Sequence, residues 1–260
     1  MEDSTRDGPT LMSVRDDLIR QEDTIVFSLI ERAKYPRNCN VYSTSFLSEI
    51  GDVVESPSLI DLFVKESEDL HAKIGMYDNQ AEVPFFPHDL PKPIFTPQNQ
   101  AHLSFLNPVA SASANVSKLI WKMYLEQLLP LLTQEGDDGN YASTLACDLL
   151  CLQALSKRIH YGKFVAEVKF RAAPDDYSFH IRNKNSDALM ELLTFEKVEN
   201  IVKARVENKG RLFGHNISLH DGEEDGYKVD PCLFSHLYGE WVIPYTKLVQ
   251  VDYLLHRSLT

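Results

Sequence analysis

Residues 151–170 read CLQALSKRIHYGKFVAEVKF, and this stretch decides the predicted fold class. Its apolar residues recur every three or four positions, as on one face of an α-helix, in a pattern that begins near Ser143. The part from Tyr161 to Phe170 also has the β-branched and aromatic residues typical of a strand, but the periodicity around it favours a helix. Gly162 is expected to lie inside one long helix that ends at Phe170.

Periodic segments of the same kind flank this stretch. They predict a helix from Ser13 to about Ala33, opened by a capping box of Ser13 and Asp16, and a second helix from Ser58 to about Met76. No alternation of strands and helices appears, so the chain is predicted to be all-α, a single domain of long helices with a Pro-rich connection. The other predicted helices cover 115–132, 174–182, 186–193, 194–213 and 230–256, the last kinked at Pro244.

The connections between these helices are also readable. Six of the 13 prolines fall between Pro84 and Pro108, which predicts a long extended segment through which no helix persists. GDDGN at 136–140 predicts a turn, and the acidic segment 219–229 predicts a loop. We divide the chain into a flexible N-terminus, residues 1–12, and a single all-helical domain, residues 13–260.

The chain is acidic, with 26 Lys and Arg against 38 Asp and Glu, a net charge of −12. Nucleic acid is therefore not an expected partner, because phosphate contacts need a basic face. A few local cations can still form a pocket for an anionic small molecule. No apolar run reaches the ~20 residues of a membrane span, so no membrane association is expected. The polar N-terminus lacks a secretory signal, which favours the cytoplasm.

Cysteine and histidine patterns point to no metal site. Cys39, Cys147, Cys151 and Cys232 have no zinc-like spacing, so we interpret all four as buried, reduced thiols. His160 lies in a mostly apolar helix and is interpreted as a core histidine rather than a base. No nucleophile elbow, P-loop or Rossmann fingerprint is present, so covalent catalysis and nucleotide use have no support in the sequence.

Two pairs of polar residues share helix faces. Arg158 and Lys169 are eleven residues apart, three turns of a helix, with apolar residues between them, and could hold a dianionic ligand. The alternative is a solvated face with pairs such as Lys163–Glu167. Thr246 and Gln250 are four apart on the last helix and form a polar inclusion on an apolar face, or simply a cap or a core hydrogen bond. By themselves, Arg15 and Glu199 look like surface charges.

Several blocks in a fixed order carry a resemblance to a known family. The sequence from about 13 to 257 resembles the all-helical chorismate mutases of plants and fungi, and the block at 151–170 is the most specific. The others are RDDLIRQEDTIVFSLIERA (15–33), PFFP (84–87), GDDGNY (136–141) and IPYTKLVQVDYLL (243–255).

The resemblance implies an isomerase that rearranges chorismate to prephenate in phenylalanine and tyrosine biosynthesis, as a homodimer without cofactor. Fungal members have Asn where this chain has Phe195, so no hydrogen bond to the ligand is expected there. The alternatives are an inactive helical paralogue that binds an amino acid or a partner, and a generic helical scaffold. The pocket of the family falls on Arg15, Arg158, Lys169, Glu199, Thr246 and Gln250.

The chemistry implied is a unimolecular pericyclic shift that needs no nucleophile, base or metal. The two arginines would bind the carboxylates of the substrate through planar guanidinium groups. Lys169 and Gln250 would donate hydrogen bonds to the ether oxygen. Glu199 would accept one from the ring hydroxyl, and Thr246 would help to fix a carboxylate. Fungal members have Glu where this chain has Gln250.

The resemblance also implies a second site, at which tyrosine inhibits and tryptophan activates many members. Fungal members have Arg at the positions of Gly75 and Met76, and regulated members have Gly at the position of Ala142. We therefore expect weak or absent feedback here, and the segment at 136–143 is also simply a turn and a helix cap. The site maps to Ile74, Gly75, Met76, Asn140, Tyr141, Ala142, Ser143 and Thr144.

Cellular location follows from the family as well. Plants have a plastid form, made with a transit peptide, and a cytosolic form. The short stretch before the first helix favours the cytosol, with the plastid stroma as the alternative if a transit peptide has been removed.

Overall fold

The computed structural model describes residues 8–45, 58–88, 90–95, 105–215 and 226–259. Across these ranges the regular structure is helical, and the only β-type pairing is an isolated bridge between His215 and Tyr227. The all-α prediction is confirmed. The α-helices are α1 (Leu11–Arg32), α3 (Leu59–Lys73), α4 (Pro108–Ser113), α5 (Ser117–Met123), α6 (Leu129–Leu132), α7 (Tyr141–His160), α8 (Gly162–Ala172), α9 (Pro174–Arg182), α10 (Ser186–Leu193), α11 (Glu196–Gly214), α12 (Pro231–Leu237) and α13 (Ile243–His256). Short 3₁₀ turns form η1 (Cys39–Tyr42) and η2 (Met76–Asp78), and π-helical turns form η4 (Tyr124–Leu128) and η5 (Tyr238–Val242).

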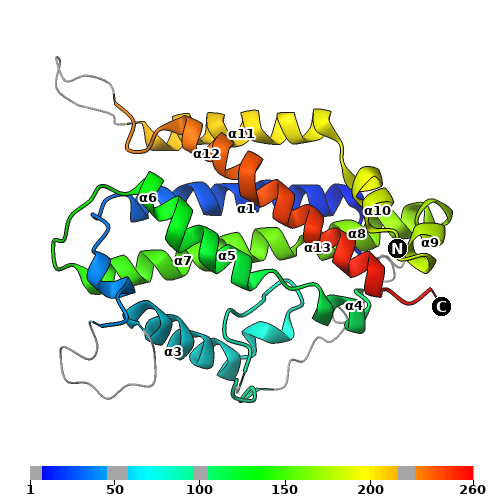
Figure 1. The fold of residues 1–260 in the computed structure, drawn as a ribbon, viewed down its shortest axis with the longest axis horizontal. Helices are drawn as coiled ribbons and strands as arrows, with labels where there is room; N and C mark the ends of the chain where they lie inside the picture. The colour runs from blue at the N-terminus through cyan, green and yellow to red at the C-terminus, as the bar shows by residue number, and fades with distance from the viewer. Residues whose placement is uncertain (1–7, 46–57, 89, 96–104, 216–225, 260) are drawn as a thin grey trace, which may run out of the picture.

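The long helices lie in parallel rows crossed by a second layer. Helices α1, α7, α8 and α11 run along the long axis of the molecule, and α1 contacts α7, α8 and α11 (Figure 1). The α5–α6 and α12–α13 segments cross this row obliquely, so that α13 packs on α7 and α8. The periodicity of α1 puts Val14, Leu18, Ile25 and Leu29 in one stripe, of which Leu18 is half-buried and the other three are fully buried between the layers.

The first helix starts two residues earlier than predicted. Thr10 is extended and its Oγ1 accepts the backbone N–H of Ser13 at 3.2 Å, while the Ser13 hydroxyl accepts the Thr10 N–H at 2.9 Å. This reciprocal pair is a capping box in which Ser rather than Glu reaches back. The predicted box of Ser13 and Asp16 is therefore wrong, and residues 11–12 belong to the helix rather than to the flexible N-terminus.

The ends of α3 have clear causes. The Ser58 side chain accepts the backbone N–H of Asp61, which confirms the predicted cap. The helix stops at Lys73, three residues before the predicted end, because Gly75 adopts the left-handed conformation at φ 79°. The Pro-rich connection has no helix in its described parts, and the buried Glu68 holds it by accepting the backbone N–H groups of Phe85 and Phe86 at 2.7 and 2.8 Å.

Pro130 and Pro244 are each preceded by a π-helical turn, η4 and η5 respectively. Proline lacks the N–H of an α-helical bond and clashes with the carbonyl four residues earlier, and a widened turn relieves both problems. The kink predicted at Pro244 is absorbed in this way, and the helix predicted over 115–132 ends at Leu132. The predicted helix to Phe170 is divided at Tyr161 into α7 and α8.

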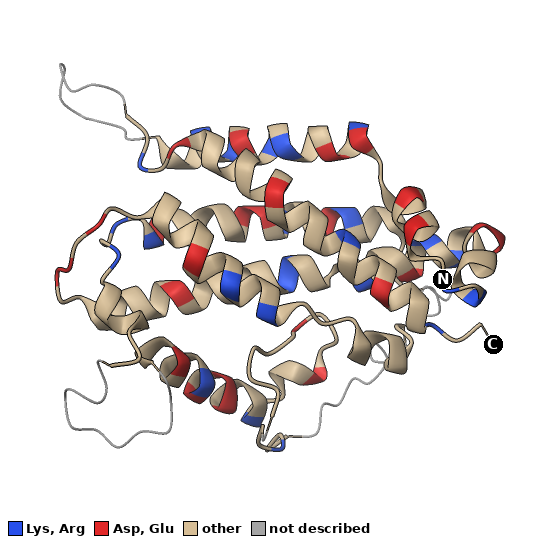
Figure 2. Cartoon of the chain, in the orientation of Figure 1, with Lys and Arg blue, Asp and Glu red and all other residues tan. Residues whose placement is uncertain are grey.

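Charged residues of both signs alternate along the same helices, as α11 shows (Figure 2). No helix in the described ranges is long and apolar enough to cross a membrane. All four cysteines are free thiols, with Cys151 buried and Cys147 half-buried. Cys39 and Cys232 are exposed, so the prediction that all four are buried is wrong for these two and is fully met only by Cys151. The predicted loop at 219–229 lies mostly outside the described residues.

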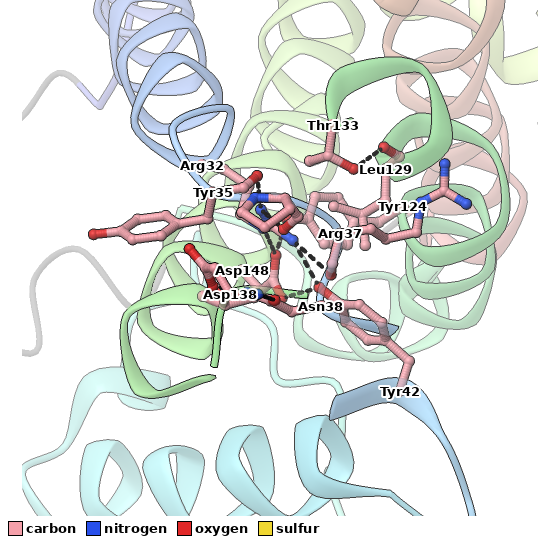
Figure 3. A network of polar contacts seen from close by, with 12 residues as sticks. Arg32, Tyr35, Arg37, Asn38, Tyr42, Tyr124, Leu129, Thr133, Asp138 and Asp148 are labelled. Atoms are coloured by element: carbon pink, nitrogen blue, oxygen red, sulfur yellow. Dashed lines mark hydrogen bonds and ion pairs between the residues drawn. The ribbon is translucent and has the colours of Figure 1, made fainter. Parts of the chain in front are cut away.

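A buried ion pair joins α1 to α7. The Arg32 Nε donates to Asp148 Oδ1 at 2.6 Å, and neither side chain is exposed to solvent (Figure 3). The hydroxyls of Tyr42 and Tyr124 donate to the same carboxylate at 2.6 and 2.7 Å. The remaining guanidinium N–H groups of Arg32 bond to the Tyr42 hydroxyl and to backbone carbonyls of residues 35–37, so this cation has a partner on every side.

We predict that Asp148→Asn lowers the free energy of unfolding by roughly 3–5 kcal/mol, because it leaves the Arg32 guanidinium charged and buried without its counter-ion. Urea denaturation followed by circular dichroism measures the change. Lys34→Gln is the control, since it removes an ion pair to Glu31 in which both side chains are exposed, and should not move the midpoint. Equal midpoints for the two variants would contradict the prediction.

Candidate functional site

Arg158 is the most buried of the predicted site cations. It lies near the end of α7 with 5% of its surface exposed, and its Nη1 is 3.4 Å from the Thr246 hydroxyl on α13. Its Nε has no hydrogen-bond partner among the described residues. A buried donor without a partner is rare in folded proteins. Arg158 therefore presents an unused N–H group, as expected of a residue that binds a ligand.

Thr246 and Gln250 lie together on the buried side of α13, 7% and 5% exposed. The Thr246 hydroxyl donates to the Val242 carbonyl at 2.6 Å, and Gln250 Nε2 is 3.4 Å from the Thr246 carbonyl. The alternative of a core hydrogen bond thus describes Thr246 in this structure. Gln250 differs, because its 3.4 Å contact is long and its Oε1 is buried without a partner in the described chain.

Gly162 sets how closely α8 approaches this pair. A Cβ atom added at Gly162 would lie 2.8 Å from the Thr246 carbonyl oxygen and 3.4 Å from the Gln250 side chain. Real side chains do not come that close to backbone oxygens, so only glycine fits here without a shift of one helix. Gly162, expected from the sequence to lie inside one long helix, starts α8 and is required by the crossing of α8 and α13.

Lys169 on α8 carries an ammonium group among other charges. Burial and the positive charge of Arg15 on α1 lower its pKa to about 8, against the opposite effect of Glu199 on α11. Glu199 itself pairs with Lys247 of α13 at 3.0 Å. The face of the Phe195 ring lies 4.4 Å from Lys169 Nζ. Lys169, Arg15 and Glu199 are thus electrostatic neighbours, as the resemblance implied.

The structure rejects the solvated-face alternative for this part of the chain. Lys163 is 3% exposed, and burial lowers its pKa to about 8; it donates to the Ser111 carbonyl at 3.2 Å. Glu167 does not pair with it but accepts bonds from Arg171, Tyr253 and Arg257. Arg15 is the site residue that does lie exposed at the surface.

His160 is a core residue, as interpreted from the sequence. Burial lowers its pKa to about 3, so the ring is neutral at physiological pH. Its Nε2 accepts the backbone N–H of Val116 at 3.0 Å, and its Nδ1 lies 2.9 Å from the Ser156 carbonyl. Both ring nitrogens are occupied, which leaves no role as a base.

Sequence reasoning missed two residues of the site. Lys247 follows Thr246 directly, but its ion pair with Glu199 joins positions 48 residues apart and no local pattern indicates it. Tyr238 lies fully buried with its hydroxyl unpartnered among the described groups, and Arg158 Cζ is 5.7 Å from its ring centroid. The one available signal was the helical spacing of Tyr238, Val242 and Thr246, which places them on one face.

The structure also describes both predicted effector segments, residues 74–76 and 140–144. Ile74 is exposed next to the turn at Gly75. In α7, the Thr144 hydroxyl accepts from Asn38 Nδ2 at 2.8 Å, and just before it Asn140 Nδ2 donates to Asp138 at 2.9 Å. Ala142 and Ser143 are exposed in the first turn of α7. The polar groups of Asn140 and Thr144 are therefore engaged within the chain.

Comparisons with known proteins agree with one another. The family profile described as chorismate mutase type II matches residues 140–251. The chain is 53% identical to Chorismate mutase 2 of Arabidopsis thaliana, over 94% of this chain and 91% of that protein. It is 50% identical to the cytosolic Chorismate mutase 2 of Zea mays, over 96% and 97%. To the chloroplastic Chorismate mutase 1 of Petunia hybrida it is 48% identical, over 95% and 76%.

Solved structures give the same answer for the fold. The crystal structure of AtCM1 with tyrosine bound in its allosteric site superposes with a TM-score of 0.84 at 47% identity, covering 98% of both chains. The Aro7p chorismate mutase of Candida albicans in complex with L-Trp superposes with a TM-score of 0.87 at 33% identity, covering 96% of this chain and 93% of that one.

We predict that Gly162→Ala lowers the melting temperature, because the added methyl group forces α8 away from α13 and overpacking of this kind costs about 1–3 kcal/mol. The sign is informative, since alanine is otherwise the better helix former by up to ~1 kcal/mol. The control is Gly239→Ala, where the new methyl group would meet only the flexible Lys203 side chain at 3.4 Å. Calorimetry should show a loss for the first variant alone.

Proposed function

The chain belongs to the chorismate mutase family, and from that premise we propose how its residues carry the reaction. The enzyme converts chorismate to prephenate, an isomerisation in the biosynthesis of aromatic amino acids. The observation that carries the residue assignments is the buried Arg158 of α7, whose Nε has no partner among the described residues. Helix α7 packs on α13, which carries Thr246 and Gln250. The rest of this proposal assigns roles to the six predicted residues.

Arg158 and Arg15 bind the two carboxylates of chorismate. A guanidinium group matches a carboxylate with two parallel N–H donors, which fixes orientation as well as charge. Arg158 is preorganised because its packing against Tyr238 and Thr246 limits its rotamers. Arg15 is exposed and closes on the ligand from α1. Together they hold the side chain of the substrate over its ring, so that the two reacting carbons are near each other before the bond forms.

Lys169 and Gln250 donate to the ether oxygen as its bond to the ring breaks. Negative charge grows on this oxygen in the transition state, and a fixed donor aimed at it is worth about 3–4 kcal/mol. Gln250 Nε2 makes only a 3.4 Å contact in this structure, so turning towards the substrate costs it little. The reaction needs no proton transfer from either group, because the electrons move within the substrate.

Glu199 accepts the hydrogen bond of the ring hydroxyl, and Thr246 supports a carboxylate through Arg158. The 3.0 Å pair with Lys247 limits the movement of the Glu199 side chain. Lys247 also lies 3.4 Å from the Thr194 hydroxyl, so it spans from α13 to the start of α11. Its role is to position Glu199 rather than to touch the substrate.

We further propose that the protein is a homodimer whose second site accepts an aromatic amino acid. Structures of relatives hold tyrosine in an allosteric site or are complexes with L-Trp, which supports an effector site of this kind. The candidate segments are those at 74–76 and 140–144. Asn140 and Thr144 would have to exchange their bonds to Asp138 and Asn38 for bonds to an effector, which weakens binding. The single domain, predicted over residues 13–260 and starting with α1 at Leu11, is also part of the proposal.

The cytosol is the proposed location, with the plastid stroma as the alternative. Support comes from the slightly higher identity to the maize protein named as cytosolic, 50%, than to the Petunia protein named as chloroplastic, 48%. A fluorescent fusion of the full-length gene product tests it, and import into plastids would overturn it.

The role of Lys169 predicts that Lys169→Met loses about 100- to 1000-fold in kcat, the usual loss for one preorganised donor. Thr246→Val should lose less than about tenfold, since it acts through Arg158. The loss of the ultraviolet absorbance of chorismate measures both. Lys122→Met is the control, because that lysine is exposed on α5. If a folded wild type shows no turnover, the proposed function is wrong. If Lys169→Met keeps the wild-type rate, the function stands and the role assigned to Lys169 is wrong.

The role proposed for Gln250 predicts how the rate depends on pH. An amide donates at every working pH, so wild-type kcat/KM should stay level from about pH 6 and fall only as Lys169, with its pKa of about 8, loses its proton. In Gln250→Glu the buried carboxyl must be protonated to donate, and burial raises its pKa above the usual 4.3. The variant should therefore lose activity from about pH 5 upwards. Superimposable profiles would mean that Gln250 does not touch the reacting oxygen.

Feedback is predicted to be weak or absent. Ala142 adds a methyl group where a close backbone approach is needed, and neither Gly75 nor Met76 offers a cation to the effector carboxylate. Tyrosine titrated into the assay at sub-millimolar concentrations should change the rate little. A steep inhibition curve in that range would contradict this prediction.

A further inference from the structure

Phe195 is an aromatic residue in an unusual place. It follows Thr194 in the two-residue connection between α10 and α11, with 51% of its surface exposed. It makes no capping hydrogen bond for α11. Its ring does not enter the core but lies with its face 4.4 Å from the Lys169 ammonium group. This separation is within the range of a cation–π interaction, in which the negative face of the ring attracts the cation.

The Phe195 ring is the contact that the described part of the chain provides for the Lys169 ammonium group. No hydrogen bond or ion pair to its Nζ is formed by the residues that the structure describes. The nearby carboxylate, Glu199, is taken by Lys247 at 3.0 Å. A ring face attracts the ammonium group electrostatically but accepts no directional hydrogen bonds from it. A carboxylate would accept hydrogen bonds from its N–H groups. The three N–H groups of Lys169 thus stay available for a substrate oxygen.

Lys169 can lose its positive charge near neutral pH, because its pKa is lowered. Arg15 faces it from α1 and, with burial, lowers its pKa to about 8, while Glu199 on α11 acts in the opposite direction and is itself shared with Lys247 of α13. An attraction that favours the charged form of Lys169 changes the protonated fraction most when the pKa lies near the working pH. With this pKa, about half of the Lys169 side chains are neutral at pH 8 and unable to support the reaction in this way.

We propose that Phe195 is a positioning residue for Lys169, whose ring face holds the ammonium group charged and aimed at the substrate. The inference rests on the proposed role of Lys169. It gives a positive function to the position at which no ligand hydrogen bond was expected. Phe195 acts through Lys169 and does not itself touch the reacting atoms.

The test replaces the ring by an apolar side chain without a π face. Phe195→Leu keeps the cover over Lys169 but removes the attraction, so the pKa of Lys169 should fall by about half a pH unit. Competitive acetylation across pH, read by mass spectrometry of the peptide that contains Lys169, reports this pKa whether or not the enzyme turns over. Phe195→Tyr retains the ring and should restore the wild-type value.

Activity gives the second readout. If the pKa of Lys169 falls by half a unit from about 8, kcat/KM of Phe195→Leu should be lower than that of the wild type by about 2.5-fold at pH 8.5. At pH 6.5 the two values should be nearly equal. Phe179→Leu is the matched control, since Phe179 on α9 is also an exposed phenylalanine, 65% exposed, and should change neither readout.

The outcomes separate cleanly. A Lys169 pKa that stays constant or rises in Phe195→Leu overturns the proposal, because the ring then only excludes water. The same holds if activity falls equally at both pH values. If the pKa falls but Lys169→Met keeps its rate, the contact is real and the proposed role of Lys169 is what fails. Should the Leu variant not fold, Phe195→Met carries the same test.

Discussion

The site depends on how closely α8 can lie against α13. At Gly162 the two helices are so near that a methyl group would meet the carbonyl oxygen of Thr246 at 2.8 Å. One turn along α8, Glu167 accepts hydrogen bonds from Tyr253 and Arg257, which lie at and beyond the far end of α13. A close crossing at one point and a buried ionic clamp at another fix the register of α13 along α8. Thr246, Gln250 and Lys169 keep their relative positions for that reason.

Two buried arginines show how the fold separates support from function. Arg32 has a carboxylate, a hydroxyl and three backbone carbonyls around it, so its desolvation is compensated and it joins α1 to α7. Arg158, on the same α7, has no ion pair within the described structure: it contacts Thr246 at 3.4 Å and the Tyr238 ring at 5.7 Å, and its Nε is unpartnered. A buried charge left in this state is unfavourable without a ligand. An anion that pairs with Arg158 would remove this cost, which favours binding.

The electrostatics of the site are local rather than global. The whole chain carries a charge of −12, yet the charged neighbours of Lys169 are Arg15 and Glu199, and Glu199 is paired with Lys247. Lys247 ties that carboxylate to α13, and the Glu22 carboxylate, buried on α1, accepts from Arg205 and Lys209 of α11. These pairs hold α11 on both neighbours. Arg205, Lys209 and Lys247 are thus paired with carboxylates, whereas Lys169 has no ion pair among the described residues.

The sequence by itself determined the elements whose cause is local. Helices 174–182 and 186–193, the Ser58 cap and the extended Pro-rich connection follow from propensity, capping and the geometry of proline, which act over a few residues. The shared faces of Arg158 with Lys169 and of Thr246 with Gln250 follow from helical spacing. Their meeting around one substrate came from the resemblance, not from spacing. Only the tertiary structure decided that Gly162 is needed for a helix crossing, that Lys163 is buried, that Lys247 takes Glu199 and that Phe195 covers Lys169. Each of these contacts joins helices far apart in the chain, and pairing across such distances depends on the packing of the whole molecule, which leaves no periodic trace in the sequence.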